Sequence, residues 1–539
     1  MELAPSAHED TTTRGWLLDV APAPDLVPEP DHRCPLNAAG VLDDAVRGGA
    51  DRRCLVTDSG TWSYGDLLAR ANQVAGALVR RWGLRPGNRV LLHGPNTPWY
   101  AACYLGVLRA GGVVVPVPWG VRAREVAPIA ELTEVDLAVA DARYAADLAE
   151  LAQRVDVLLF GAEPTEFGRE VDAGPDAFAP VRTSADDVAV VDFTSGSTGA
   201  PKCAMHLHRD LVFAALNHHR MLDLSPDDLV ASNGSIAFGY LLGALVLAPL
   251  ARGAAALFVE DDDFDAFFDA AHRHRATVFA STPGLYRRGL RTGAPVPPGL
   301  RIALSGGEKL DQGTRDGWLE ATGAPLVDHL GTTELMAPVI GTPRGEAHRR
   351  DTLGRAMPGF RVRVLDDEGH EVPVGRPGRL AVRGASGCLY VKDPVAQAEG
   401  VRDGWTHTGD RATLDADGHV VVHGRGRDLV MVDGINVATT EVETVLRALP
   451  AVADVAVVGV PDACGVTALV AFVTPTGVDR GLVGLVREHA RRELAQYKQP
   501  RVVRVLDRLP RNARNKVDHR ALAEVARAAV GALSFSGSV

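Results

Sequence analysis

The chain has 539 residues, more than one hydrophobic core usually organises, so two or more domains are expected. A hydrophobic content of 46% and a charged content of 23% are typical of a soluble globular protein. The formal net charge of -11 argues against nucleic acid and against anionic membranes as general partners.

The first 35 residues are rich in Pro, Asp and Glu and predict a loose leader without the layout of a signal peptide. Pro249 and Arg252 interrupt the most apolar stretch, residues 236–259, so we expect a buried core segment there rather than a membrane span. The six cysteines form no Cys-x-x-Cys pair, and most are expected to be buried as small apolar residues. These features favour a soluble, cytoplasmic protein.

Between residues 36 and 425, short apolar runs alternate with helical patterns, as in α/β domains. Residues 188–193 predict a buried strand, and residues 210–222 predict a helix. Residues 301–304 and 325–330 predict two further buried strands, each followed by a polar loop that contains Gly. Ligands of open α/β sheets bind at the carboxyl ends of strands, so these loops are candidate sites.

Residues 426–530 predict a smaller α+β domain of ordinary size. Two helices are expected, one at 441–449 with Thr440 as its N-cap and one at 482–497. Three strands are expected, at 454–460, 468–473 and 502–506. A disordered tail is expected at 531–539.

The most informative segment reads TSGSTGAPK and contains Thr194, Ser195, Gly196, Ser197, Thr198, Gly199 and Lys202. Its small residues let several backbone N–H groups point at one anion, while its hydroxyls and its lysine add donors and positive charge. It is not a Walker loop, because the G-x-x-x-x-G-K-[ST] spacing is absent. Alone, such a run is more typical of a flexible surface turn, so its interpretation depends on later segments.

Four later segments complete a pattern: residues 330–334 (LGTTE), 406–410 (THTGD), 424–428 (GRGRD) and 509–516 (LPRNARNK). With TSGSTGAPK, in this order, they resemble the signatures of the adenylate-forming superfamily: acyl- and aryl-CoA ligases, peptide-synthetase adenylation domains and luciferases. The resemblance spans residues 38–525. It implies an α/β fold with a large N-terminal domain of layered sheets and helices and a small, mobile C-terminal α+β domain.

The resemblance implies an enzyme that uses ATP and Mg²⁺ to activate a carboxylic acid as an acyl-adenylate. Charge crowding hinders attack of a carboxylate on the α-phosphorus, so cations and positioning should dominate catalysis. Lys516 is expected to reach the α-phosphate and carboxylate oxygens, and His206 and Glu334 are also expected to be catalytic. Glu334 and Thr198 are the expected Mg²⁺ ligands. Besides the TSGSTGAPK run, the implied nucleotide-binding residues are Gly307, Glu308, Asp328, Gly331, Thr332, Thr333, Asp410, which would accept hydrogen bonds from the ribose, and Arg425.

Further positions concern the acid. By resemblance to benzoate-type ligases, the expected acid-binding residues are Phe238, Gly239, Tyr240, Ser305, Gly306, His329 and Leu330. Aromatic walls suit a flat ring by stacking, although ordinary core packing is the alternative for Phe238 and Tyr240. His329 stands where benzoate ligases often have Gly, and it could hydrogen-bond an amino or hydroxyl group on the ring. A substituted benzoate, such as an anthranilate or hydroxyanthranilate, is therefore expected.

The acyl acceptor is the open point. The resemblance places the domain hinge at Arg427 and Asp428 and the thiol tunnel at Gly434. Met431 stands where CoA ligases commonly have Lys. The leading hypothesis is an aryl-acid:CoA ligase that releases AMP and pyrophosphate, with a homodimer as one possible assembly. The alternative is an adenylating enzyme that transfers the acyl group to a carrier-protein thiol, an amine or a hydroxyl.

A non-catalytic nucleotide-binding scaffold is an alternative from another class. The joint presence of Lys202, Glu334, Asp410 and Lys516 argues against it. Asn515 stands where the family has Gly before the catalytic lysine. Because Asn tolerates left-handed backbone geometry better than most residues, this change is compatible with the expected loop.

Overall fold

The computed structural model describes residues 36–119, 121, 123–161, 164–195, 201–260, 264–346, 348–425, 429–432, 435–461, 467–477, 481–494, 498–512 and 515–533. It divides into two compact units, here called unit 1 and unit 2. Unit 1 comprises the chain up to Gly375, Leu380–Thr408 and Leu414–Val421. Unit 2 comprises Arg376–Arg379, Gly409–Thr413 and the chain from Val422 onward. The expected leader at 1–35 lies outside the described residues.

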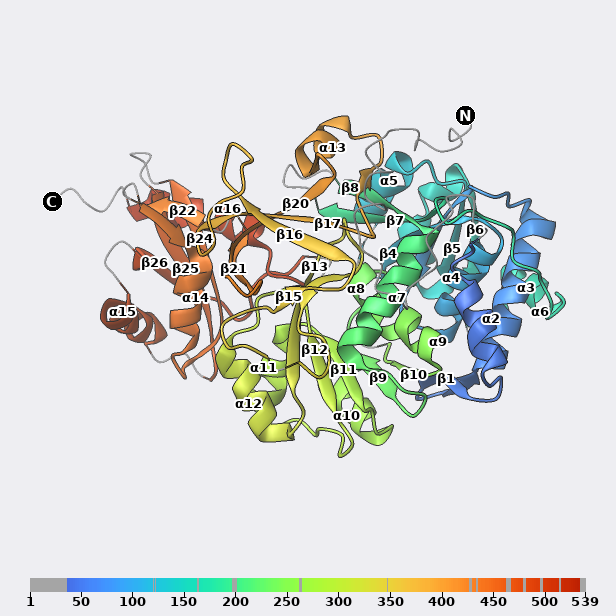
Figure 1. Cartoon of the computed structure of the whole chain (residues 1–539), viewed down its shortest axis with the longest axis horizontal. Helices are drawn as coiled ribbons and strands as arrows, with labels where there is room; N and C mark the ends of the chain where they lie inside the picture. The colour runs from blue at the N-terminus through green and yellow to red at the C-terminus, as the bar shows by residue number, and fades with distance from the viewer. Residues whose placement is uncertain are drawn as a thin grey trace. The chain divides into compact units, whose positions relative to one another are not determined.

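A nine-stranded sheet of order β15-β14-β13-β12-β11-β9-β10-β1-β2 forms one layer of unit 1. Its strands are β1 (Arg53–Thr57), β2 (Gly60–Ser63), β9 (Leu229–Ser232), β10 (Ala255–Phe258), β11 (Val278–Ser281), β12 (Ile302–Ser305), β13 (Leu326–Gly331), β14 (Pro338–Gly341) and β15 (Arg355–Ala356). Neighbouring strands from β13 to β1 run parallel. Helices α10 (Phe264–Arg273), α11 (Pro283–Thr292) and α12 (Gln312–Thr322) pack against it through Phe267, Tyr286 and Trp318 (Figure 1).

A seven-stranded sheet of order β18-β8-β7-β4-β3-β5-β6 forms another layer of unit 1. Its strands are β3 (Arg89–Gly94), β4 (Val113–Pro118), β5 (Leu137–Asp141), β6 (Asp156–Phe160), β7 (Val188–Ser195), β8 (Pro201–Leu207) and β18 (Leu389–Tyr390). The other α-helices in the described part of unit 1 are α2 (Gly40–Arg47), α3 (Tyr64–Trp82), α4 (Pro98–Arg109), α5 (Ala123–Leu132), α6 (Glu166–Asp172), α7 (His208–Leu222), α8 (Gly239–Leu241), α9 (Ala248–Arg252) and α13 (Pro394–Gly400). Local sequence sets their ends: Ser63 and Asp66 form a capping box at the start of α3, and Gly83 ends it in the left-handed conformation.

A third sheet has the order β16-β17-β20-β19, and β21 pairs with β20. Its strands are β16 (Phe360–Leu365), β17 (Pro377–Gly384), β19 (Val401–Arg402), β20 (Trp405–Leu414) and β21 (Val420–Arg425). Asp410 lies on β20, in the short stretch Gly409–Thr413 that belongs to unit 2.

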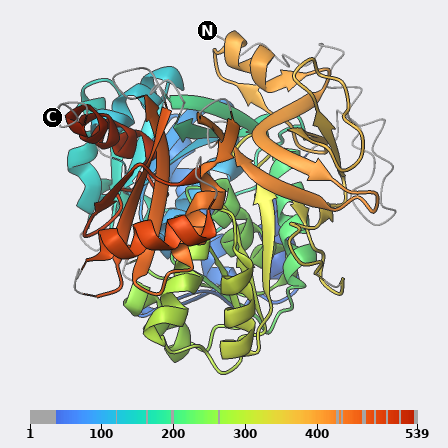
Figure 2. The same cartoon turned by 90° about the vertical axis from the view of Figure 1, so that its left-hand side faces the viewer.

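Unit 2 is built around a three-stranded sheet of β24 (Val452–Pro461), β25 (Thr467–Pro475) and β26 (Val502–Val505). Helices α14 (Thr439–Arg447) and α15 (Leu482–Glu493) pack on one face of the sheet. Helix α16 (His519–Leu533) packs on the other face (Figure 2). A hairpin of β22 (Leu429–Val432) and β23 (Ile435–Ala438) precedes α14. This is the α+β arrangement that the sequence predicted.

The elements predicted in unit 1 are confirmed with one correction. Strand β7 and helix α7 occupy the expected positions, and β12 and β13 are the two further buried strands. Between β7 and α7, however, residues 201–207 form β8, and Thr194 pairs with Lys202 across the ladder. The ends of the TSGSTGAPK run are therefore strand residues, and residues 196–200 lie outside the description.

Three expectations about unit 2 need correction. Thr440 lies inside α14, where its hydroxyl donates to the carbonyl of His423 at 3.3 Å instead of capping the helix. Helix α15 ends at Glu493 rather than at 497. Helix α16 runs to Leu533, so residues 531–533 are helical rather than part of a tail.

The apolar stretch 236–259 is a buried core segment, as predicted, in which a π-helical turn (Leu242–Leu247) joins α8 to α9. Within the described residues, no helix combines the length and hydropathy needed to cross a membrane. Cys54, Cys103, Cys203 and Cys388 are buried free thiols, which confirms the expectation for these four.

Candidate active site

Polar residues gather where the parallel strands of the nine-stranded sheet end. Ser232, Ser281 and Ser305 are the last residues of β9, β11 and β12, and all three are buried. Parallel neighbours have their carboxyl ends at one edge, which is where open α/β sheets bind ligands. The segments predicted to bind acid and nucleotide, 238–240, 305–308 and 330–334, follow β9, β12 and β13 at this edge.

Glu334 is the centre of a charged group. The hydroxyl of Tyr390 on β18 donates to Glu334 Oε1 at 3.1 Å. The ammonium group of Lys202 on β8 lies 5.9 Å from the centroid of the Tyr390 ring, within the range of a cation–π contact. Pairing of β18 with β8 brings these two residues together from distant parts of the sequence. Lys202 and Glu334, both predicted, are thus neighbours in the fold.

His206 is fully buried on β8 beside this group. Burial lowers its pKa to about 4, although the backbone of Thr333 and the negative charge of Glu334 act in the opposite direction. Its Nδ1 lies 4.0 Å from Asp210 Oδ2, and burial raises the pKa of Asp210 to about 6. His206 is therefore a neutral imidazole near Glu334. His208, by contrast, accepts a hydrogen bond from the backbone N–H of Ala38 at 3.1 Å, which is a structural role.

The predicted acid-binding residues form a second group, around Tyr240. Its hydroxyl donates to the carbonyl of Leu304 at 3.1 Å, and its ring lies 4.7 Å from that of His329. The Nδ1 atom of His329 donates to the carbonyl of Ser305 at 2.8 Å, so its Nε2 is the acceptor nitrogen. Burial, with a smaller contribution from His218, lowers the pKa of His329 to about 3. This histidine is neutral at physiological pH.

Two glycines leave room for neighbouring side chains to lie close to the backbone. A Cβ atom at Gly306 would lie 2.4 Å from Cε1 of His329. A Cβ atom at Gly239 would lie 3.4 Å from both Asp192 Oδ2 and Met336 Cγ. Met336 follows Glu334 by two residues, so the Tyr240 group and the Glu334 group are adjacent within unit 1. Phe238 and Leu330 are half-buried beside them.

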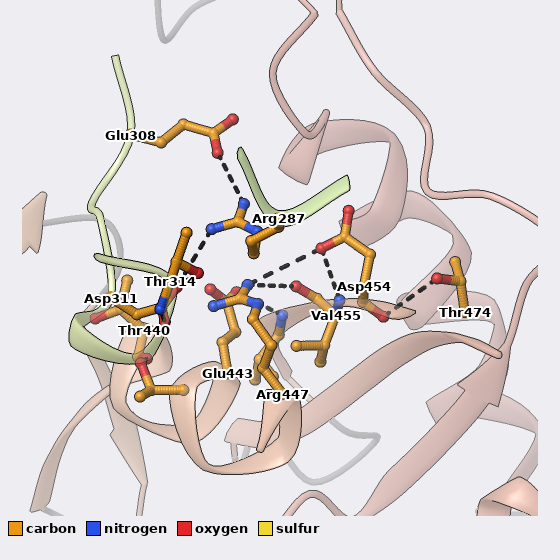
Figure 3. A network of polar contacts seen from close by, with 12 residues as sticks. Arg287, Glu308, Asp311, Thr314, Thr440, Glu443, Arg447, Asp454, Val455 and Thr474 are labelled. Carbon is orange, nitrogen blue, oxygen red and sulfur yellow. Dashed lines mark hydrogen bonds and ion pairs between the residues drawn. The ribbon is translucent and has the colours of Figure 1, made fainter. Parts of the chain in front are cut away.

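The loop after β12 is held by Arg287 of α11. The guanidinium of Arg287 lies 3.5 Å from Glu308 Oε2 and 3.5 Å from Asp311 Oδ2 (Figure 3). Asp311 in turn caps α12 by accepting the backbone N–H of Thr314 at 2.8 Å. Gly307 has a φ of +84°, a conformation that favours glycine.

The remaining predicted residues of unit 1 lie on or after β13. Asp328 is buried 4.0 Å from the guanidinium of Arg315, and burial raises its pKa to about 7. Thr332 is buried, Thr333 is half-buried and Gly331 is exposed. All three adjoin Glu334 in sequence, at the strand end where the prediction put them.

Two of the predicted site residues in unit 2, Asp410 and Lys516, have described side chains. Asp410 is buried on β20, and Lys516 is half-buried in a loop after β26. Asn515 has a φ of +57°, so the left-handed geometry that Asn was expected to tolerate is present. Six predicted residues, Gly196, Ser197, Thr198, Gly199, Arg427 and Asp428, lie outside the described residues, as does Gly434. The side chains of Thr194, Ser195 and Arg425 are also outside the description.

Sequence reasoning missed two residues of these groups. Tyr390 lies on a two-residue strand with no alternating pattern, so no sequence signal connects it with Glu334. His218 packs edge-on against His329, with ring centroids 6.1 Å apart. It follows His208 in the helical pattern of α7 and would be interpreted from sequence as a core position.

We expect the free energy of unfolding to fall as the pH drops from 6.5 toward 4. In the native state burial lowers the pKa of His206, His208 and His218 to about 4 and that of His329 to about 3, while unfolded histidines have a pKa near 6.5. The unfolded state therefore binds more protons in this window, which lowers stability. Asp210 and Asp328 oppose this effect because their native pKa values are raised, but the histidines outnumber them.

Thermal unfolding at several pH values measures this dependence. His208→Asn removes one buried histidine and should flatten the pH dependence of Tm, whereas His272→Gln changes an exposed histidine and should not. A Tm that stays constant or rises between pH 6.5 and 4.5 would contradict the assignment of these histidines as neutral.

Comparisons with known proteins agree with this architecture. Residues 42–389 match the family model of the AMP-binding enzyme, and residues 441–516 match that of the AMP-binding enzyme C-terminal domain. A 3-hydroxybenzoate–CoA ligase from Aromatoleum sp. strain CIB is 33% identical over 520 residues, covering 92% of this chain and 99% of the relative. A benzoate CoA ligase from Burkholderia xenovorans LB400 superposes with a TM-score of 0.81 at 27% identity, covering 90% and 99% of the two chains. An amide bond synthetase from Marinactinospora thermotolerans gives 0.80 at 27% identity, covering 91% and 100%.

Proposed function

Because the chain belongs to the AMP-binding enzyme family, we propose that it activates an aryl carboxylic acid with ATP and transfers the acyl group to coenzyme A. In the first step a carboxylate oxygen attacks the α-phosphorus, the bond to the β-phosphate breaks, and pyrophosphate leaves. In the second step the thiol sulfur attacks the acyl carbon, a thioester forms, and AMP leaves. The observation that carries the aryl assignment is the similarity of nearly the whole chain to a 3-hydroxybenzoate–CoA ligase.

In this proposal the first step depends on positive charge. Lys202, beside Tyr390 and Glu334, holds the β- and γ-phosphates, and Lys516 contacts the α-phosphate and carboxylate oxygens as charge develops. Asp410 accepts hydrogen bonds from the ribose hydroxyls, and its burial suits an ionic hydrogen bond. His206 is neutral, so it adds no charge beside the phosphates. It can line the site as an uncharged side chain or donate a hydrogen bond.

The residues present suit Mg²⁺. Glu334 is half-exposed and offers carboxylate oxygens, the ligand type that Mg²⁺ prefers, and Tyr390 holds one of them in place. Thr198 is the second proposed ligand. When bound, the ion would neutralise part of the phosphate charge.

For the acid, we propose a ring that carries a hydrogen-bond donor. Because Nδ1 of His329 donates to Ser305, its Nε2 can only accept, which favours a hydroxyl or amino substituent over an unsubstituted ring. The neighbouring Tyr240 supplies an aromatic surface, and Gly306 leaves the space that the imidazole needs. The substituted benzoate expected from the sequence is thus also favoured by the hydrogen bonding of this histidine.

His329→Phe is expected to lower the preference for hydroxybenzoate over benzoate by about tenfold in kcat/KM, because the acceptor nitrogen is removed while an aromatic ring is kept. Steady-state kinetics with both acids measure this ratio, and benzoate serves as the internal control for general damage. An unchanged ratio would refute the role given to His329.

A second acceptor class is favoured by two observations. Met431 replaces the lysine common in CoA ligases, and the amide bond synthetase of similar fold is named for a different product class. Product analysis of complete reactions separates the two candidates. An aroyl-CoA thioester formed only when CoA is present supports the CoA ligase, and an amide formed from an added amine, with no thioester, would replace it. We further propose that the enzyme works in the cytoplasm.

A further inference from the structure

Lys516 lies in a short, tightly bonded hairpin of unit 2. A bridge between Arg511 and Val517 closes the loop. The carbonyl of Lys516 accepts the backbone N–H of Asn512 at 2.8 Å, and its own N–H donates to Asn512 Oδ1 at 3.2 Å. Asn512 therefore fixes the backbone of Lys516 on both sides of its Cα atom.

The guanidinium of Arg511 joins this loop to the sheet of unit 2. Its Nη1 donates to the carbonyl of Asn515 at 2.7 Å, and its Nη2 donates to Asp454 Oδ2 at 2.9 Å. Asn515 is the residue with a φ of +57°, and it immediately precedes Lys516. Because the guanidinium is planar, its two donors hold both acceptors in one fixed geometry.

Asp454 is itself held in place on β24. Its Oδ1 accepts the backbone N–H of Val455 at 2.9 Å. Arg447 of α14 points at the same carboxylate, with Nη2 4.0 Å from Oδ1, and donates to the carbonyl of Val455 at 3.4 Å (Figure 3). The ion pair of Arg511 with Asp454 is partly exposed, so it contributes little to stability. Its importance is that the same guanidinium also binds the backbone carbonyl of Asn515, next to the proposed catalytic lysine.

We propose that Arg511, held by Asp454, is a positioning residue for Lys516. By binding the carbonyl of Asn515, its guanidinium maintains the left-handed turn and sets the direction in which the lysine side chain leaves the loop. The inference rests on the proposed function, in which Lys516 acts in adenylation. A small displacement of a catalytic group lowers a rate steeply, so loss of the contact should lower kcat by about 10- to 100-fold.

Arg511→Gln removes the guanidinium, and Asp454→Asn removes the negative charge that holds it. Arg508→Gln, which changes an exposed arginine three residues earlier, is the matched control. ATP–pyrophosphate exchange measures the adenylation half-reaction. Thioester formation from synthetic aroyl-adenylate and CoA measures the other half-reaction, in which Lys516 has no proposed role. We expect both variants to have a lower kcat for exchange, while their KM values for ATP and acid stay within about twofold of those of the wild type.

Three results support the inference when they occur together. Thioester formation stays near the wild-type rate, Tm stays within about 2 °C, and the double variant is no worse than the poorer single variant, as expected of two residues that act as one unit. Arg511→Lys, which keeps the positive charge but lacks the planar pair of donors, should retain intermediate activity. Exchange within about twofold of the wild type in Arg511→Gln, or an equal loss in both half-reactions, would overturn it. Absence of exchange in the wild type would instead refute the proposed function.

Discussion

Lys516→Ala is expected to lower the rate of adenylate formation by about 10²- to 10³-fold, the largest effect we anticipate from a single substitution. The ammonium group is the charge proposed to stabilise the α-phosphate and carboxylate oxygens as they approach each other. The half-buried side chain lies on a loop whose backbone is held by Asn512 and Arg511, so its removal should leave that loop in place.

ATP–pyrophosphate exchange measures this loss. Equilibrium binding of ATP should change little, because Lys202, which is proposed to hold the β- and γ-phosphates, is left intact. Lys498→Ala is the matched control, since Lys498 pairs with Glu441 in the same unit and has no proposed catalytic role. A Lys516→Ala variant that exchanges pyrophosphate at the wild-type rate would remove this residue from the mechanism.

Glu334→Gln is expected to reduce kcat by about 10²-fold, because it removes the carboxylate charge proposed to bind Mg²⁺ while keeping the volume of the side chain. The Mg²⁺ concentration that gives half-maximal activity should rise in parallel. The same substitution removes the negative charge beside His206. Because that charge raises the pKa of His206, its loss would lower this pKa further.

Tyr390→Phe is the matched control for Glu334. It removes the hydroxyl that donates to Oε1 but leaves the carboxylate, so a loss of less than about tenfold is expected from one hydrogen bond. If Tyr390→Phe were as damaging as Glu334→Gln, the hydrogen bond rather than the metal would explain the role of Glu334. A Glu334→Gln enzyme with unchanged Mg²⁺ dependence would also contradict the account.

Much of the fold could be predicted because the spacing of apolar residues and the positions of Gly and Pro indicate the same elements. The nearly continuous apolar run 188–193 lies in β7, which is a buried inner strand between β4 and β8, and the runs 301–304 and 325–330 correspond to β12 and β13. Asn515 could be interpreted as left-handed because few residue types tolerate that conformation, and the structure has it there.

Other features depended on tertiary contacts that no local pattern encodes. Thr440 resembles an N-cap, yet helix α14 begins at Thr439. The hydroxyl of Thr440 instead donates to the carbonyl of His423 on β21. Tyr390 meets Glu334 only because a two-residue strand pairs with β8. The contact from Asp454 through Arg511 to Asn515 spans 61 residues of sequence between its ends, and long-range polar contacts of this kind leave no periodic signal.

The most direct test of the central claim is ATP–pyrophosphate exchange by the wild-type enzyme across hydroxy- and aminobenzoates, benzoate, fatty acids and amino acids. The account predicts exchange that depends on an aryl acid and is fastest with a hydroxyl or amino group on the ring. Exchange with fatty acids or amino acids that exceeded that with every aryl acid would contradict it.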